Sequence, residues 1–146
     1  MGYFRLGAIA FTVCAFVGTA AYAEEKDITV SPVPSDQRAA AKAMKNPIDK
    51  TPENIAKGKA IFEGKGTCFN CHGVSGKGDG PAGQILNPSP RNFTNPKFHK
   101  LRTDGEMFWV IKNGSAGTGM VPLIPSAITE EEAWYAILYE RSFEGK

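Results

Sequence analysis

The sequence predicts an all-α fold, and three observations carry the prediction. Three segments begin with a helix-capping pattern and continue with apolar residues at helical spacing. The connection between the first two is rich in glycine and proline and lacks the apolar and polar alternation of a β-strand. The 146 residues, of which 42% are hydrophobic and 22% charged, have the composition of one globular domain. We therefore expect a single domain and no multidomain enzyme.

Residues 1–23 predict a secretory signal peptide. Arg5 is the only charge before an apolar run, and Ala21-Tyr22-Ala23 supplies the small-x-small pattern that signal peptidases cut. The alternative is an uncleaved anchor, because the uncharged stretch that ends at Ala23 is at the short end of what can span a bilayer. Both interpretations place the protein outside the cytoplasm, and we expect a periplasmic location.

Residues 24–50 predict an extension or linker. Three prolines surround an Ala/Lys-rich patch, residues 38–45, which could form a turn or two of helix. The segment has too few large apolar residues to bury anything. We expect it to wrap the domain or to meet a partner, with plain disorder as the alternative. The domain proper then covers residues 51–146.

Each of the three expected helices has a defined start. Thr51 caps the first, and Gly58 on its apolar stripe indicates the close approach of another helix. Residues 103–106 form a capping box for the second helix, which stops at Asn113-Gly114. Residues 129–132 form another capping box, with three carboxylates at the positive end of the helix dipole.

The connection between the first two helices cannot build a core by itself. Residues 73–83 hold five glycines, and four prolines lie between residues 81 and 96. Long connections of this kind are unusual in a compact domain unless something other than side chains fills the middle. We expect a bulky cofactor to do so.

Cys68-Phe69-Asn70-Cys71-His72 is the C-x-x-C-H pattern of covalent haem attachment. Two residues between the cysteines bring both sulfurs to one side of a helical turn, where they can add to the two vinyl groups of a haem. His72 can then bind the iron as its proximal ligand.

Three alternatives compete with haem attachment. A zinc site needs four ligands, and only His99 remains as a further candidate, with no second cysteine pair. A thioredoxin-like dithiol needs a βαβ context, which the sequence lacks. A structural disulfide between Cys68 and Cys71 is the simplest alternative in an oxidising compartment.

A haem iron bound by one histidine needs a sixth ligand or stays open. Met120 is the strongest candidate, because the glycine-rich residues 114–119 can bring its thioether to the distal face. Met107 lies on the apolar face of a helix and is better explained by core packing. His99 would give a bis-histidine haem of lower potential, and an open site is the remaining alternative.

Over about residues 51–143 the sequence resembles the class I c-type cytochromes, which are small monohaem electron-transfer proteins. The resemblance implies the cytochrome c fold, with three main helices and long loops wrapped around one haem c. It implies a carbonyl acceptor for the proximal imidazole, which we place at Pro81. It also implies an arginine that pairs with a haem propionate, which we place at Arg91. The ligand loop departs from the family pattern, because Val121 separates Met120 from the following proline.

The resemblance implies an electron carrier rather than an enzyme. We expect it to shuttle single electrons in the periplasm between a donor and an acceptor protein. The alternative is a haem-bearing subunit docked permanently in a larger respiratory or oxidoreductase complex, which could be membrane-bound. A weaker alternative, a gas sensor or peroxidase, would require that Met120 is not bound to the iron. A net charge of +2 excludes a nucleic-acid binder, and no small-molecule substrate is expected.

Charge is unevenly distributed along the chain. Residues 24–102 carry 13 basic and 8 acidic side chains, whereas residues 103–146 carry 3 basic and 7 acidic ones. We expect basic residues to frame the haem edge and to steer an acidic partner, with a solvated mixed surface as the alternative. The candidates are Lys65, Lys77, Lys97, Lys100 and Arg102.

Overall fold

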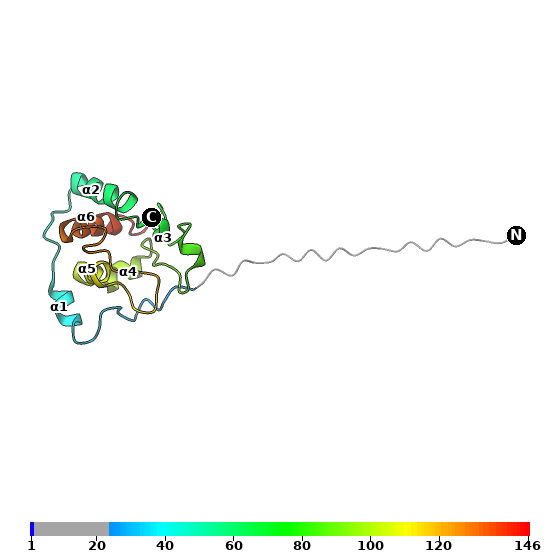
Figure 1. The fold of residues 1–146 in the computed structure, drawn as a ribbon, viewed down its shortest axis with the longest axis horizontal. Helices are drawn as coiled ribbons and strands as arrows, with labels where there is room; N and C mark the ends of the chain where they lie inside the picture. The colour runs from blue at the N-terminus through cyan, green and yellow to red at the C-terminus, as the bar shows by residue number, and fades with distance from the viewer. Residues whose placement is uncertain (2–23) are drawn as a thin grey trace.

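The computed structural model describes Met1 and residues 24–146, so the predicted signal peptide falls on residues that lie outside the described part. Within residues 24–146 the secondary structure is helical, which confirms the all-α prediction, and the only β-type pairing is one isolated bridge between Glu25 and Ser89. Figure 1 shows the short helices gathered around long loops. The elements are α1 Arg38–Ala43, α2 Pro52–Glu63, α3 Phe69–His72, the 3-10 turn η1 Gly83–Ile85, α4 Pro96–Leu101, α5 Asp104–Asn113 and α6 Glu130–Arg141.

The three helices expected from capping patterns are α2, α5 and α6. The Thr51 hydroxyl accepts a hydrogen bond from the Asn54 backbone N–H at the start of α2. Complete capping boxes form at the other two, where Thr103 pairs with Glu106 and Thr129 with Glu132. Each box satisfies backbone donors that a helix start otherwise leaves unpaired.

Helices α2 and α6 lie side by side (Figure 1), and Gly58 of α2 lies directly against the backbone of Tyr135 in α6. A β-carbon at Gly58 would overlap the Tyr135 carbonyl, so no larger residue fits this crossing. Next to it, the fully buried ring of Phe62 meets Tyr139 edge-on, with 5.3 Å between ring centroids. This crossing anchors the core and orients the inner face of α6.

The extension packs against the domain. Val33 and Ala41 are each only 1% exposed. The backbone of α1 comes so close to α5 that a β-carbon at Gly105 would overlap the Ala41 carbonyl. The Trp109 indole N–H donates to the Gln37 side chain at 2.8 Å. The expectation that residues 24–50 bury nothing is therefore wrong, because small residues allow a close backbone approach without large apolar side chains.

Backbone groups hold the first part of the extension in place. The buried guanidinium of Arg102 donates to the carbonyls of Ile28 and Val30, at 2.7 and 2.6 Å. The Ser31 hydroxyl donates to Glu106 at 2.8 Å. These contacts join the extension to the start of α5 and to the loop before it.

In the part of the chain that the structure describes, no helix is long and apolar enough to cross a membrane.

Candidate haem site

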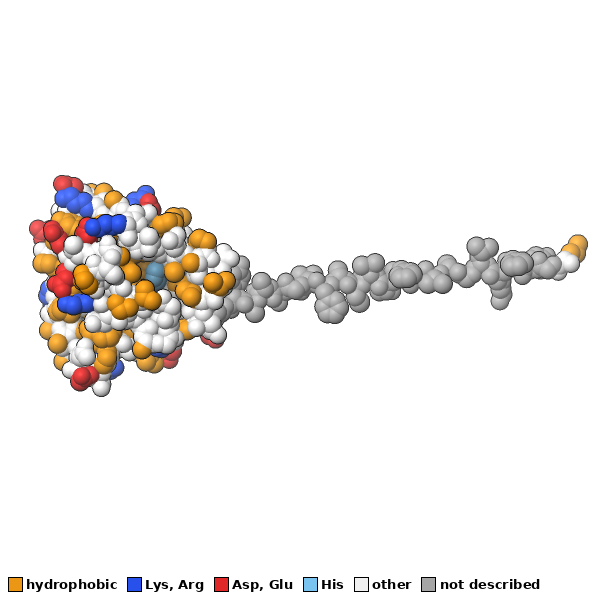
Figure 2. Space-filling view, in the orientation of Figure 1, with side chains coloured by type: hydrophobic (Ala, Val, Ile, Leu, Met, Phe, Trp, Pro, Cys, Tyr) orange, Lys and Arg blue, Asp and Glu red, His pale blue; other side chains and the backbone are white. Residues whose placement is uncertain are grey.

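A cavity of about 240 Å³ lies among the inner faces of α5 and α6, the α3 turn and the loop that carries Met120. Its walls are mostly apolar, with Phe93, Ile111 and Ala136 among the lining residues. Figure 2 shows hydrophobic and uncharged side chains over the part of the surface near the α3 loops, with most charged side chains along the opposite side, from α2 to α1. The hollow is suited to a large apolar group.

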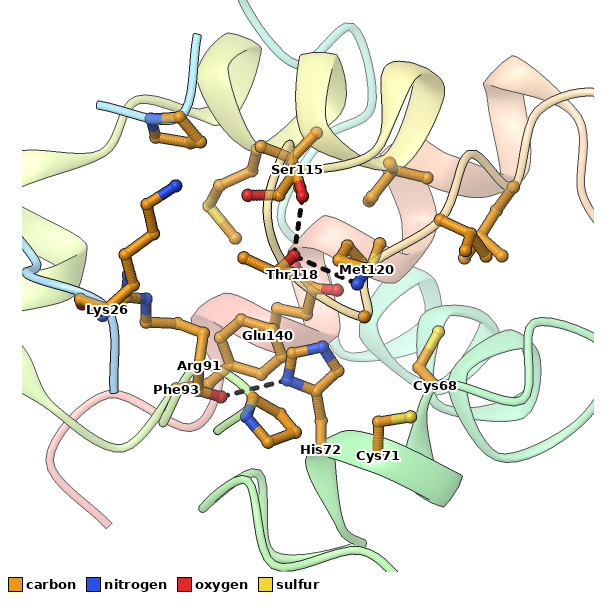
Figure 3. A pocket seen from close by; sticks show the side chains of 18 of the residues that line it. Lys26, Cys68, Cys71, His72, Arg91, Phe93, Ser115, Thr118, Met120 and Glu140 are labelled. Atoms are coloured by element: carbon orange, nitrogen blue, oxygen red, sulfur yellow. Dashed lines mark hydrogen bonds between the residues drawn. The ribbon is translucent and has the colours of Figure 1, made fainter. Parts of the chain in front are cut away.

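Cys68 and Cys71 lie on one side of this cavity, and both sulfurs face the hollow (Figure 3). Both are free thiols, so the structure does not contain the alternative disulfide. Burial, with the nearby Glu140 carboxylate adding to it, raises the pKa of Cys68 to about 12, and burial also raises the pKa of Cys71. No group of three or more metal-binding side chains occurs among the described residues, which argues against the zinc alternative.

His72 ends α3 and directs its Nε2 edge into the cavity (Figure 3). Its Nδ1–H donates to the Arg91 carbonyl at 3.0 Å, and its ring stacks on Phe93 with 4.4 Å between centroids. Burial lowers the pKa of His72 to about 4, so the imidazole is neutral near pH 7. A neutral, oriented ring with one free nitrogen is what a metal ligand requires.

The carbonyl acceptor is Arg91, and the assignment of this role to Pro81 is wrong. Pro81 is exposed, and its neighbours bind the α3 backbone instead: Gly80 N–H donates to the Cys71 carbonyl and Ala82 N–H to the Asn70 carbonyl. The loop therefore folds back on α3, and the segment that follows Pro90 passes beside the imidazole.

Arg91 lies on the side of the cavity away from the cysteines, together with Lys26 (Figure 3). Its guanidinium forms a 2.8 Å ion pair with Glu25 and donates to the Lys26 carbonyl at 3.0 Å. Arg102 lines the cavity as well. Cationic side chains at this end could offset the charge of carboxylates on a bound group.

Met120 lies across the cavity from His72 (Figure 3). Hydrogen bonds within the loop close it: Met120 N–H donates to the Thr118 hydroxyl, the Thr118 hydroxyl to the Ser115 carbonyl, and Ser115 N–H to the Met120 carbonyl. Met107 is 5% exposed and packs in the core, as expected, but it also reaches the cavity wall.

His99 is occupied outside the cavity. Its Nε2–H donates to the Phe93 carbonyl, and its Nδ1 accepts from the Arg141 guanidinium at 3.2 Å. Arg141 also forms an ion pair with Asp104. His99 therefore holds α4 to α6, and the bis-histidine alternative does not fit this arrangement.

The predicted docking lysines do not line the cavity. Lys65 is paired with Glu132 at 2.6 Å, and Arg102 is 7% exposed, so Arg102 cannot frame a docking surface. Sequence reasoning also missed two cavity residues, Lys26 and Glu140. A carboxylate within the apolar stripe of the last helix was an available signal for Glu140, whereas nothing in the sequence distinguished Lys26.

The donor set fits a haem c. Two free thiols with the attachment spacing lie beside a neutral imidazole, a thioether lies opposite, and cations lie at the far end.

Comparisons with known proteins agree with this fit. The Cytochrome c family model matches residues 55–142. A chain of the reducing HAO-like protein complex of Kuenenia stuttgartiensis is 32% identical, with a TM-score of 0.60, over 67% of this chain and 47% of that chain. The chain thus spans about half the length of that subunit.

Cytochrome cL of the marine methylotroph Methylophaga aminisulfidivorans is 19% identical over 84% of this chain and 71% of that chain, with a TM-score of 0.48. The search of curated proteins found no match. Since the family model covers more than half of the sequence and the C-x-x-C-H turn lines the cavity, this chain belongs to the cytochrome c family, whose cofactor is covalently bound haem c.

Proposed function

We propose that this protein carries single electrons between redox partners through a haem c whose iron is bound by His72 and Met120. The observation that supports this best is the placement of the His72 Nε2 edge and the Met120 thioether on opposite sides of one cavity (Figure 3). With His72 and Met120 both bound, the iron would have no open position for a substrate. The proposed role is therefore a carrier and not an enzyme.

When bound, haem c supplies a one-electron couple. The Arg91 carbonyl holds the imidazole orientation and raises its basicity, and Phe93 supports the ring face. The apolar walls exclude water, and the closed Met120 loop keeps the thioether in place, so little rearrangement accompanies electron transfer. In this proposal the Arg91 guanidinium pairs with a haem propionate, either in place of Glu25 or together with it.

The proposed docking surface combines an apolar rim with a basic periphery. Ile85 and Val121 are 87% and 59% exposed, and Val121 lines the cavity. Lys77, Lys97 and Lys100 form no ion pair with any described residue. The rim would make contact with the partner, and the lysines would steer an acidic surface towards it.

A second candidate function is a haem subunit of a larger complex. One observation favours it, namely that the Kuenenia stuttgartiensis chain of similar sequence belongs to a complex. The packing of the extension on its own domain favours the free carrier, because an assembly arm would be left unpacked. Gel filtration of native material separates the two: a carrier elutes near the mass of one chain with haem, and a subunit co-elutes with other chains.

We propose export to the periplasm with cleavage after Ala23. The sequence pattern of residues 1–23 is the support for this proposal. The intact mass of the purified protein tests it, since a cleaved chain begins at Glu24 and carries one haem. A mass that includes the leader would favour the uncleaved anchor.

Optical spectra with and without carbon monoxide test the carrier function. A low-spin ferric spectrum with the weak methionine-to-iron charge-transfer band, and no response of the reduced protein to carbon monoxide, is the expected result. A high-spin spectrum that changes with carbon monoxide would instead indicate an open site, as in a sensor or peroxidase.

A further inference from the structure

One acidic side chain in the cavity wall has no role in the proposed electron transfer. Glu140 lies near the end of α6, one turn after Ala136, and both residues line the cavity. Figure 3 shows the Glu140 side chain directed into the hollow that His72 and the cysteines share. The residue as a whole is only 5% exposed, so this is a carboxyl group inside the protein.

The Glu140 carboxyl is unsatisfied by protein groups and opens onto the cavity. Among residues 24–146, no side chain or backbone N–H donates a hydrogen bond to the Glu140 carboxyl. Every side-chain oxygen that is fully buried in these residues does have a hydrogen-bond partner. The Glu140 oxygens therefore keep some free surface, and the residue lines the cavity. A haem in the cavity would cover that surface.

The charged groups around Glu140 do not neutralise it. Its neighbour Arg141 is paired with Asp104 at the start of α5, and the α2 carboxylate Glu63 is bonded to Tyr139. Cys68 on the α3 side is an uncharged thiol, and with haem attached it would be an uncharged thioether. Each of the other charged side chains in the cavity wall has a hydrogen-bond or ion-pair partner other than Glu140. These side chains are Lys26, Arg91, Arg102 and Glu106.

Burial without a partner favours the neutral form of a carboxyl group. Desolvation raises the pKa of Glu140 to about 8, and the nearby charge of Asp104 adds to the rise while Arg141 opposes it. The protonation state of this group is therefore poised close to neutral pH.

We propose that Glu140 couples a proton to the electron: the protein binds a proton at the Glu140 carboxylate when it is reduced and releases it when it is oxidised. This inference rests on the proposed function, because it requires the haem in the same cavity. Ferric haem carries one more positive charge than ferrous haem, and in a low-dielectric interior that charge stabilises a nearby carboxylate. Reduction removes the charge, so the carboxylate becomes more basic.

The step balances without a further reactant. The ferric protein with an ionised Glu140 takes one electron from its donor and one proton from water, and gives the ferrous protein with Glu140 as a carboxylic acid. Only the O–H bond of the carboxyl forms, and oxidation breaks it again. Binding of the electron and the proton is reciprocal, so the reduction potential must depend on pH.

Midpoint potentials of the holoprotein, measured by spectroscopic redox titration from about pH 5 to about pH 10, test the coupling over a range that brackets the raised pKa of about 8. We expect the wild-type potential to be constant at low pH, to fall through a window by up to about 59 mV per pH unit, and to level off again. In Glu140→Gln, which mimics the protonated form, the potential should stay near the acidic plateau at all pH values.

Glu131→Gln is the matched control, because it removes one carboxylate from the exposed side of the same helix. It should keep the wild-type pH window. A window that persists in Glu140→Gln, or a wild-type potential that does not change with pH, would overturn the proposal. If Glu140→Gln does not bind haem, Glu140→Asp is measured instead. The pH range over which its potential falls must then differ from that of the wild type, and an unchanged range overturns the proposal as well.

The carrier function is tested by the optical spectrum and by reversible one-electron titration, both independent of the pH dependence of the potential. A methionine-ligated low-spin spectrum with reversible one-electron titration supports electron transfer whether or not the potential depends on pH. A pH-independent potential in such a protein removes only the role of Glu140.

Discussion

Two methionines reach the cavity wall, Met107 from the core side of α5 and Met120 from a loop. Only Met120 lies across the hollow from His72 in a loop closed by its own hydrogen bonds. Both thioethers could bind iron, so only their positions distinguish the proposed ligand from the core residue. Substitution of each methionine in turn can test this assignment.

We predict that Met120→Ala opens the sixth position of the iron. The reduced variant should bind carbon monoxide, the methionine charge-transfer band should disappear, and the potential should fall, because a thioether stabilises ferrous iron. Optical spectroscopy measures all three. Met107→Leu is the control and should keep the wild-type spectrum. Loss of the band in Met107→Leu with its retention in Met120→Ala would reverse the assignment.

Single site residues could be predicted from the sequence where a side-chain motif identifies them, but not where the role belongs to a backbone group. The C-x-x-C-H motif brings its own spacing, so its place in the cavity could be predicted. The acceptor for His72 is a backbone carbonyl, which every residue has, and the sequence could not identify it as Arg91. The loop course that brings Arg91 there depends on backbone contacts of Gly80 and Ala82.

The crossing of α2 and α6 depends on the absence of one side chain. At an exposed helical position glycine to alanine would stabilise by about 1 kcal/mol. At Gly58 the added β-carbon meets the Tyr135 carbonyl, so we expect Gly58→Ala to lose about 1 to 3 kcal/mol of unfolding free energy. Denaturant unfolding of the holoprotein measures the change.

Ala56→Gly on the exposed side of α2 calibrates helix propensity alone and should lose about 1 kcal/mol. A stability gain in Gly58→Ala would contradict the close crossing, because it would show that propensity dominates there.

The extension should contribute to stability as part of the domain. Val33→Ala removes buried methyl groups and should cost about 2 kcal/mol of unfolding free energy. Val74→Ala removes the same atoms from a side chain that is 65% exposed and should change stability by less than about 0.5 kcal/mol. Equal effects of the two substitutions in denaturant unfolding would mean that the extension does not hold to the domain in solution.

Among the elements, α2, α5 and α6 were predictable because capping patterns and apolar stripes are local. The docking of the extension was not. It rests on carbonyls of Ile28 and Val30 that bind Arg102, and on the close approach of Ala41 to Gly105. Neither contact leaves a periodic pattern in the sequence.

For the molecule as a whole, we predict that a local basic field speeds reaction with anionic partners. The triple variant Lys77→Glu, Lys97→Glu and Lys100→Glu should react with hexacyanoferrate(III), a small anionic oxidant, about tenfold more slowly at low salt. Stopped-flow oxidation of the reduced protein measures the rate constant. The wild-type rate should fall as ionic strength rises.

The control for this experiment changes the same charge elsewhere, in a triple variant with glutamate in place of Lys42, Lys45 and Lys50. It should slow the reaction much less. Equal slowing by the two triple variants would assign the effect to net charge, and the lysines would lose their proposed steering role.

The need for a cofactor was also predictable for the whole molecule, because the glycine- and proline-rich connection cannot fill a core. The shape of the cavity was not, since its walls come from α3, α4, α5 and α6, from the loops between them and from the extension. The sequence therefore predicted what the cavity holds better than what encloses it.

The ion pair between Glu25 and Arg91 joins residues that are 66 positions apart in the chain. A contact at such separation closes a long loop of chain, whereas the turn that carries Cys68 and Cys71 is local. We therefore expect the wall that Glu25 and Lys26 form to close after that turn. Such an order would leave this end of the cavity open while the haem reaches both thiols.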